Sequence, residues 1–246
     1  MSNLTTARWH LINDKMPWDK AVNDSLLELI NDKLGYAPAS AISEPIANLP
    51  APGTPQKVAL CLGHARPVDQ GNVGAGGISE EQYNTMLIGM IATKLTLKGI
   101  ACVIVDFYPG HSYEEAMQWL AMHLLRQRCT AAVEFHFNAF DGKAAGREVL
   151  HWEKSTRGIT LAQSILDSEN GAFPDRVNRG LKPKGHRARG ALFLSLTHCP
   201  AAISEPFFGD NEEEWAYFAK PENIDRLAEA NAEGIARWVE AQEVPA

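Results

Sequence analysis

The sequence predicts an α/β fold: a single twisted, mostly parallel sheet flanked by helices on both faces, with a short N-terminal helical appendage. From residue 57 onward, apolar runs of strand composition alternate with longer runs whose apolar residues recur at helical spacing. The predicted strands read as continuous apolar runs more than as alternating ones, which is typical of a sheet covered on both faces. A proline-rich stretch with almost no charge, residues 37–56, divides this pattern from the N-terminal segment.

The elements follow in order along the chain. Residues 1–36 are expected to form a helical segment, because apolar residues recur at helical spacing between Trp18 and Tyr36 and Gly35 is placed to end the helix. Residues 37–56 are expected to be an extended linker, and residues 57–246 one domain. Within that domain the predicted strands are residues 57–62, 101–106, 131–137, 147–152, 191–196 and 201–204, and the predicted helices are residues 79–97, 113–128, 160–167 and 224–241.

Composition and charge exclude several classes of partner. The 23 lysines and arginines face 30 aspartates and glutamates, a net charge of -7, so the chain lacks the basic field that attracts nucleic acid or anionic lipid. No stretch approaches the length of a membrane span, and the first residues do not read as a signal peptide. We therefore expect synthesis in the cytoplasm without a signal peptide, no nucleic-acid partner and no membrane insertion.

Polar side chains lie at or just after the ends of three apolar runs. His64 follows the first predicted strand in a Gly-His pair, His136 lies near the end of the strand predicted at residues 131–137, and Glu205 follows the last strand. Ligands of open α/β sheets bind beyond the carboxyl ends of the strands, so these three side chains are candidates for one site.

An acidic helix start supplies a further candidate ligand. Ser79 is the predicted N-cap of the helix that follows the glycine-rich loop, and either Glu80 or Glu81 could turn its carboxylate to the site. Two imidazoles and a carboxylate around an open position are a common ligand set for catalytic zinc, and a separate glutamate can take the proton from zinc-bound water. The residues therefore point to zinc-assisted hydrolysis.

Motifs along the chain carry a resemblance to a known family. They are LCLGHARPVDQGN at residues 60–72, Glu80 with Asn84, EFHFNA at residues 134–139, GREVLHW, TLAQSIL, VNRGLK, and the closing set Pro200, Ala201, Glu205, Phe208 and Asn211. Over residues 57–239 the chain resembles the zinc-dependent N-acetylmuramoyl-L-alanine amidases of the type-3 amidase family. These enzymes cleave the amide between the lactyl group of N-acetylmuramic acid and L-alanine in peptidoglycan.

The resemblance implies roles for individual residues. His64, Glu80 and His136 would bind zinc, and Glu205 would serve as general base and acid. Asn138 and Arg179 would contact the substrate, a peptidoglycan strand or muropeptide. A phage lysin released through a membrane lesion, or a toxin injected by a secretion machine, would reach the bacterial cell wall without an export signal of its own.

Two other functions remain open at this point. A related zinc carboxypeptidase or N-acyl amino-acid amidohydrolase on the same fold would need a cation for the substrate carboxylate, for which Arg66, Arg179 and Arg189 are available. A non-catalytic peptidoglycan binder would keep the fold and lose the chemistry. One departure from the family pattern lies at the proposed site, because Glu134 occupies a position that is usually serine.

Overall fold

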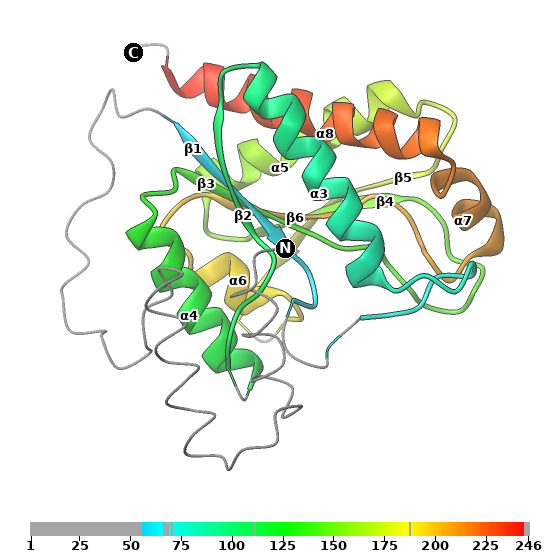
Figure 1. Ribbon diagram of the computed structural model, residues 1–246, viewed down its shortest axis with the longest axis horizontal. Helices are drawn as coiled ribbons and strands as arrows, with labels where there is room; N and C mark the ends of the chain where they lie inside the picture. Colours follow the sequence, from blue (N-terminus) through cyan, green and yellow to red (C-terminus); the bar gives the residue numbers. More distant parts are fainter. Residues whose placement is uncertain (1–55, 66–68, 70, 111, 187, 244–246) are drawn as a thin grey trace, which may run out of the picture. The chain divides into compact units, whose positions relative to one another are not determined.

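The computed structural model describes residues 56–65, 69, 71–110, 112–186 and 188–243 (Figure 1). The predicted N-terminal helix, the linker apart from Gln56, and Arg66 lie outside the described residues. Within the described ranges, none of the helices is long and apolar enough to cross a bilayer.

A six-stranded sheet forms the centre of the described domain, with strand order β2-β1-β3-β6-β4-β5. The strands β2, β1, β3 and β6 run parallel, β4 is antiparallel to β6, and β5 is parallel to β4. This confirms the predicted mostly parallel sheet. The bounds are β1 Lys57–Leu62, β2 Ala101–Val105, β3 Ala131–Phe135, β4 Arg147–Trp152, β5 Asn178–Lys184 and β6 Ala201–Glu205.

Helices cover both faces of the sheet. The bounds are α3 Glu80–Leu97, α4 Tyr113–Arg126, α5 Thr156–Ala172, α6 Ala191–Leu196, α7 Glu212–Phe218 and α8 Pro221–Glu243. The helices α3 and α5 pack on one face with α8 against both of them, whereas α4 and α6 pack together on the other face (Figure 1). The central strands β1 and β3 are consequently buried, which explains why their sequences are apolar at successive positions.

The prediction of a strand at residues 191–196 is wrong, since this segment forms the helix α6. A six-residue apolar run has no periodicity that separates a buried strand from a short helix. Gly190 adopts a left-handed conformation with φ of 81° directly before the helix. Alanine and leucine favour helix, and Ala191 and Leu194 lie one turn apart on the buried side.

Two elements were not predicted. The strand β5 has the sequence NRGLKPK, in which glycine and proline interrupt any apolar pattern. These two residue types are tolerated there because β5 lies at the edge of the sheet. The helix α7 begins with three glutamates after Asn211, whose side chain accepts hydrogen bonds from the N–H groups of Glu213 and Glu214. Its signal is an N-cap with acidic residues in the first turn rather than a long amphipathic pattern.

One carboxyl group is fully buried between the sheet and the helices that cover it. Glu169 on α5 accepts hydrogen bonds at Oε1 from Ser204 Oγ (3.0 Å) and Asn231 Nδ2 (2.9 Å), whereas its Oε2 has no hydrogen-bond partner within the described part of the chain. Burial raises the pKa of Glu169 to about 7, although these hydrogen bonds and the charge of Arg147 oppose the rise.

We predict that Glu169 makes the folded protein less stable as pH rises. Between the ordinary pKa of a glutamate and the raised value, the folded chain holds a proton that the unfolded chain has lost, so the free energy of unfolding falls by about 3 kcal/mol across this window. Replacement Glu169→Gln keeps an acceptor at Oε1 and removes the titration. The melting temperature of this variant should therefore decline less than that of the wild type between about pH 5 and about pH 8.

Asp167→Asn is the matched control, because Asp167 is exposed on the same helix. This control should follow the wild type at every pH. Equal pH dependence of the wild type and the Glu169→Gln variant would contradict the assignment.

Candidate functional site

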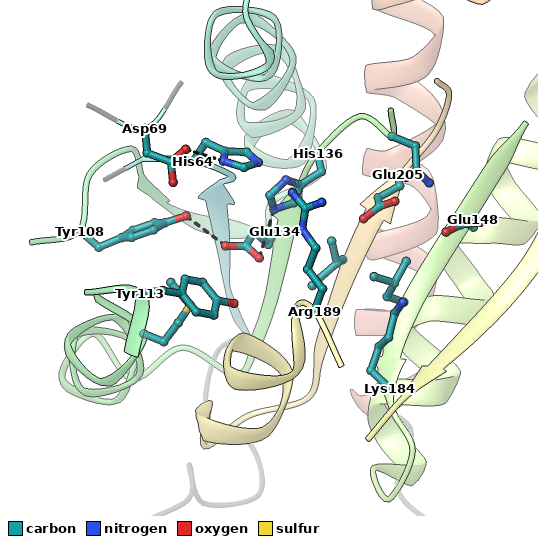
Figure 2. A pocket seen from close by; sticks show the side chains of 15 residues that line it. His64, Asp69, Tyr108, Tyr113, Glu134, His136, Glu148, Lys184, Arg189 and Glu205 are labelled. Carbon is teal, nitrogen blue, oxygen red and sulfur yellow. Dashed lines mark hydrogen bonds and ion pairs between the residues drawn. The ribbon is translucent and has the colours of Figure 1, made fainter. Parts of the chain in front are cut away.

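The candidate site lies at the carboxyl edge of the parallel strands. His64 follows β1, His136 follows β3, and Glu205 is the last residue of β6. Because β1, β3 and β6 run in the same direction, their polar ends are brought together (Figure 2).

The ring of His64 is fixed by its backbone and by one carboxylate. His64 has φ of 59°, in the left-handed region, so the chain turns sharply after the strand. Nδ1 of the ring lies 2.8 Å from Asp69 Oδ1, which leaves Nε2 facing inward, 3.4 Å from Glu80 Oε2. Gly71 packs closely over this pair, since a Cβ there would lie 2.7 Å from Glu80 Oε2.

Glu80 reaches the site because it is the first residue of α3. Ser79 and Gln82 form a capping box that sets where the helix begins, and Glu80 is only 1% exposed. Glu80 Oε1 lies 2.8 Å from His136 Nδ1, and Oε2 accepts the backbone N–H of Asn72 at 3.1 Å. Burial alone would raise the pKa of Glu80, but the hydrogen bond and charge of His136, the charge of His64 and the Asn72 N–H outweigh burial and lower it. The side chain is therefore ionised.

These three side chains form a candidate metal site. His64, Glu80 and His136 each offer one ligand atom, and these atoms lie within 4.8 Å of one another. Nε2 of His64 is buried and has no hydrogen-bond partner among the described residues, as expected of a nitrogen that binds a metal ion. Two imidazole nitrogens and a carboxylate match the donor types that zinc prefers, so the residues fit this ion. Glu80, rather than Glu81, lies in the cluster.

Glu134 holds His136 from the opposite side. It lies two residues before His136, is buried, and places Oε2 3.3 Å from His136 Nε2 while Oε1 accepts a hydrogen bond from Tyr108 Oη at 3.0 Å. Burial opposes protonation of His136, but the hydrogen bonds and charges of Glu134 and Glu80 raise its pKa well above the usual value. The sequence marked Glu134 only as a replacement for serine. Its position two residues before His136 on an extended chain could have revealed the contact.

A pocket of about 200 Å³ opens beside the cluster on the face of the sheet that carries α4 and α6 (Figure 2). Burial raises the pKa of Glu205, with the charges of Glu148 and Glu80 adding to the rise and those of His136 and Lys184 opposing it. The lining residues are His64, Asp69, Tyr108, Tyr113, Met117, Glu134, His136, Asn138, Glu148, Leu150, Lys184, Arg189, Gly190, Ile203 and Glu205.

The two expected substrate contacts differ in position. Asn138 lines this pocket and an adjoining one, and its Nδ2 is buried without a hydrogen-bond partner among the described residues. Arg179 lines the adjoining pocket, where its Nε lies 2.7 Å from Glu148 Oε2 and its guanidinium stacks over the ring of Phe208. The structure therefore places Arg179 beside the pocket that contains the histidines, with Glu148 between the two.

A family model described as N-acetylmuramoyl-L-alanine amidase matches residues 58–237. The chain belongs to this amidase family. Apart from Lys57, the match includes every described strand, and it contains His64, Glu80, His136 and Glu205.

Individual relatives agree with this membership. An endolysin of Bacillus phage SPP1 is 30% identical over 104 residues, which cover 42% of this chain and 38% of the endolysin. The solved structure of the amidase AmiC2 of Nostoc punctiforme is 23% identical, covers 75% of this chain and 97% of its own, and has a TM-score of 0.64. The CwlD amidase of Clostridioides difficile, solved in complex with the GerS lipoprotein, is 18% identical, covers 76% and 99%, and has a TM-score of 0.67. These structures confirm the α/β fold of this amidase-family chain.

The close approach of Gly63 to His136 yields a test of the site geometry. A Cβ at position 63 would lie 2.4 Å from His136 Cε1, so Gly63→Ala must displace the ring or the strand end. We predict that this substitution lowers the free energy of unfolding by about 1–3 kcal/mol in urea denaturation.

Gly89→Ala is the control for that substitution. Gly89 lies within α3, and a Cβ there would meet nothing within 4 Å, so this variant should match or slightly exceed the wild type in stability. A Gly63→Ala variant as stable as the Gly89→Ala variant would contradict the described packing.

Proposed function

We propose that residues 57–246 form a zinc-dependent N-acetylmuramoyl-L-alanine amidase domain. The reaction is hydrolysis of the amide between the lactyl group of N-acetylmuramic acid and L-alanine in peptidoglycan. The observation that carries this proposal is the convergence of His64, Glu80 and His136 beside Glu205, within a chain of this amidase family.

His64, Glu80 and His136 are the proposed zinc ligands. Zinc bound there would polarise the scissile carbonyl and lower the pKa of a coordinated water. Contacts within the protein fix the position of each proposed ligand. Asp69 orients His64, Glu134 orients His136, and the N-cap of α3 sets the position of Glu80.

Glu205 is the proposed general base and acid. Its carboxylate makes no hydrogen bond or ion pair with a described residue, so it is available to the reacting groups. The raised pKa suits a carboxylate that takes a proton from the attacking water and returns it to the leaving amine. The acyl carbon therefore gains the water oxygen, the amide C–N bond breaks, and the amine leaves with the proton that Glu205 carried.

Asn138 and Arg179 are the proposed substrate contacts outside the zinc site. The buried Nδ2 of Asn138 lacks a hydrogen-bond partner among the described residues, and Asn138 lines both pockets. Arg179 is held by Glu148 and stacks on Phe208, so its position is fixed for contact with a polar group of the substrate.

The proposed place of action is the bacterial cell wall. Similarity to a phage endolysin supports release of the protein from an infected cell, and injection by a secretion machine is the alternative route. The proposed partner in either case is peptidoglycan or a muropeptide.

The proposed reaction predicts which products and which losses a hydrolysis assay will show. The zinc-loaded protein should convert a defined muropeptide into the intact stem peptide with a free alanine amine, identified by mass spectrometry. Glu205→Gln should lower kcat by about 100-fold or more, because a positioned proton shuttle typically contributes at least that factor. Chelation should abolish turnover, and added zinc should restore it.

Glu240→Gln, an exposed position on α8, serves as the matched control and should keep wild-type turnover. Unchanged kcat in the Glu205→Gln variant would reject the proposed shuttle. Release of a C-terminal residue or of a small acylated amino acid would instead support the carboxypeptidase or amidohydrolase alternative, and binding without any product would support the non-catalytic one.

A further inference from the structure

Two cationic side chains line the pocket without forming an ion pair to a described residue. Lys184 is half-buried at the end of β5, and Arg189 is exposed in the segment that leads into α6. Neither side chain forms an ion pair or hydrogen bond with a described residue. They are therefore available for an anionic group that enters the pocket.

Three of the acidic side chains that line the pocket form hydrogen bonds or ion pairs with other residues. Asp69 is bonded to His64, and Glu134 lies between His136 and Tyr108. Glu148, at the far side, is paired with Arg179. Glu205 also lies in this pocket and the charge of Lys184 acts on it, but neither Lys184 nor Arg189 forms an ion pair with a described residue.

The cationic side chains enter the pocket from other elements than the histidines and Glu205. His64, His136 and Glu205 lie at the carboxyl edge of the sheet, while Lys184 and Arg189 approach from the β5 and α6 side (Figure 2). The same pocket is also lined by less polar side chains, namely Tyr113 and Met117 from α4, Leu150 from β4 and Ile203 from β6. Apolar walls exclude water, and an ionic hydrogen bond gains strength where water is excluded.

We propose that Lys184 and Arg189 form a carboxylate-binding subsite, which selects a peptide with a free carboxylate close to the scissile amide. This inference rests on the proposed amidase function and adds two residues that would distinguish a free carboxylate from a carboxamide in the peptide. In the intact substrate the lactyl carboxyl is already consumed in the amide, so a carboxylate near the reacting bond belongs to the peptide. Arginine binds a carboxylate through two parallel N–H groups, and lysine adds a point charge.

The test compares two synthetic muramyl peptides that differ at one group. One has a free carboxylate on the residue after alanine, and the other has a carboxamide there. The zinc-loaded wild type should cleave the carboxylate form with a kcat/KM about tenfold higher, mainly through a lower KM, because a charged hydrogen bond is replaced by a neutral one. Arg189→Ala and Lys184→Ala should each reduce this ratio, and the double variant should bring it to about one.

Two further variants distinguish the effect of the positive charge at position 189 from an unspecific loss of activity. Arg189→Lys keeps the charge and should retain part of the preference. Lys154→Ala removes an exposed lysine that does not line the pocket, and should retain all of it. Thermal unfolding of each variant shows that the fold is intact.

The outcomes distinguish this inference from the function on which it rests. Equal cleavage of both peptides by the wild type, or an equal loss for both peptides in the alanine variants, overturns the carboxylate subsite and leaves the amidase function standing. No cleavage of either peptide by the zinc-loaded wild type contradicts the amidase function itself, and the subsite with it.

Discussion

The buried carboxylate of Glu80 is the interaction on which the rest of the site depends. An ionised carboxylate that is 1% exposed costs several kcal/mol unless charges and hydrogen bonds compensate for its lost hydration. His136, His64 and the Asn72 N–H provide that compensation, and each belongs to a different segment of the chain. The same requirement ties the start of α3 to the ends of β1 and β3. A divalent cation would complete the balance, because it supplies positive charge at the point where the three side chains meet.

The directions of the strands explain which residues line the pocket. Parallel β1, β3 and β6 deliver the two histidines and Glu205 to one edge, and antiparallel β4 brings Glu148 to the same edge, opposite Glu205. The strand β5 then runs away from this edge, so Lys184 at its end reaches the pocket from the other side. One sheet thus presents proton-transfer groups and positive charge to the same pocket. In the proposed function, these positive charges would hold the peptide beside the reacting groups.

Those parts of the fold that depend on continuous apolar runs could be predicted from the sequence, as could the candidate ligands. The strands β1 and β3 and the helix α3 have clear patterns, and polar residues at the strand ends pointed to His64, His136 and Glu205. The strand β5 and the helix α6 were missed or misassigned, because an edge strand tolerates glycine and proline, and six apolar residues do not distinguish strand from helix. Because β5 was not predicted, Lys184 at its end was not recognised as a pocket residue. The contact of Glu134 with His136 is a property of the folded strand end, and the sequence alone showed only an unusual residue.

Zinc stoichiometry, measured by elemental mass spectrometry on protein purified with zinc and dialysed, tests the central claim most directly. The account predicts about one zinc ion per wild-type chain and a large loss in a folded His64→Ala, His136→Ala double variant, since three protein ligands are the usual minimum for a catalytic zinc. A wild type that binds no zinc, or a double variant that retains a full equivalent, would contradict it.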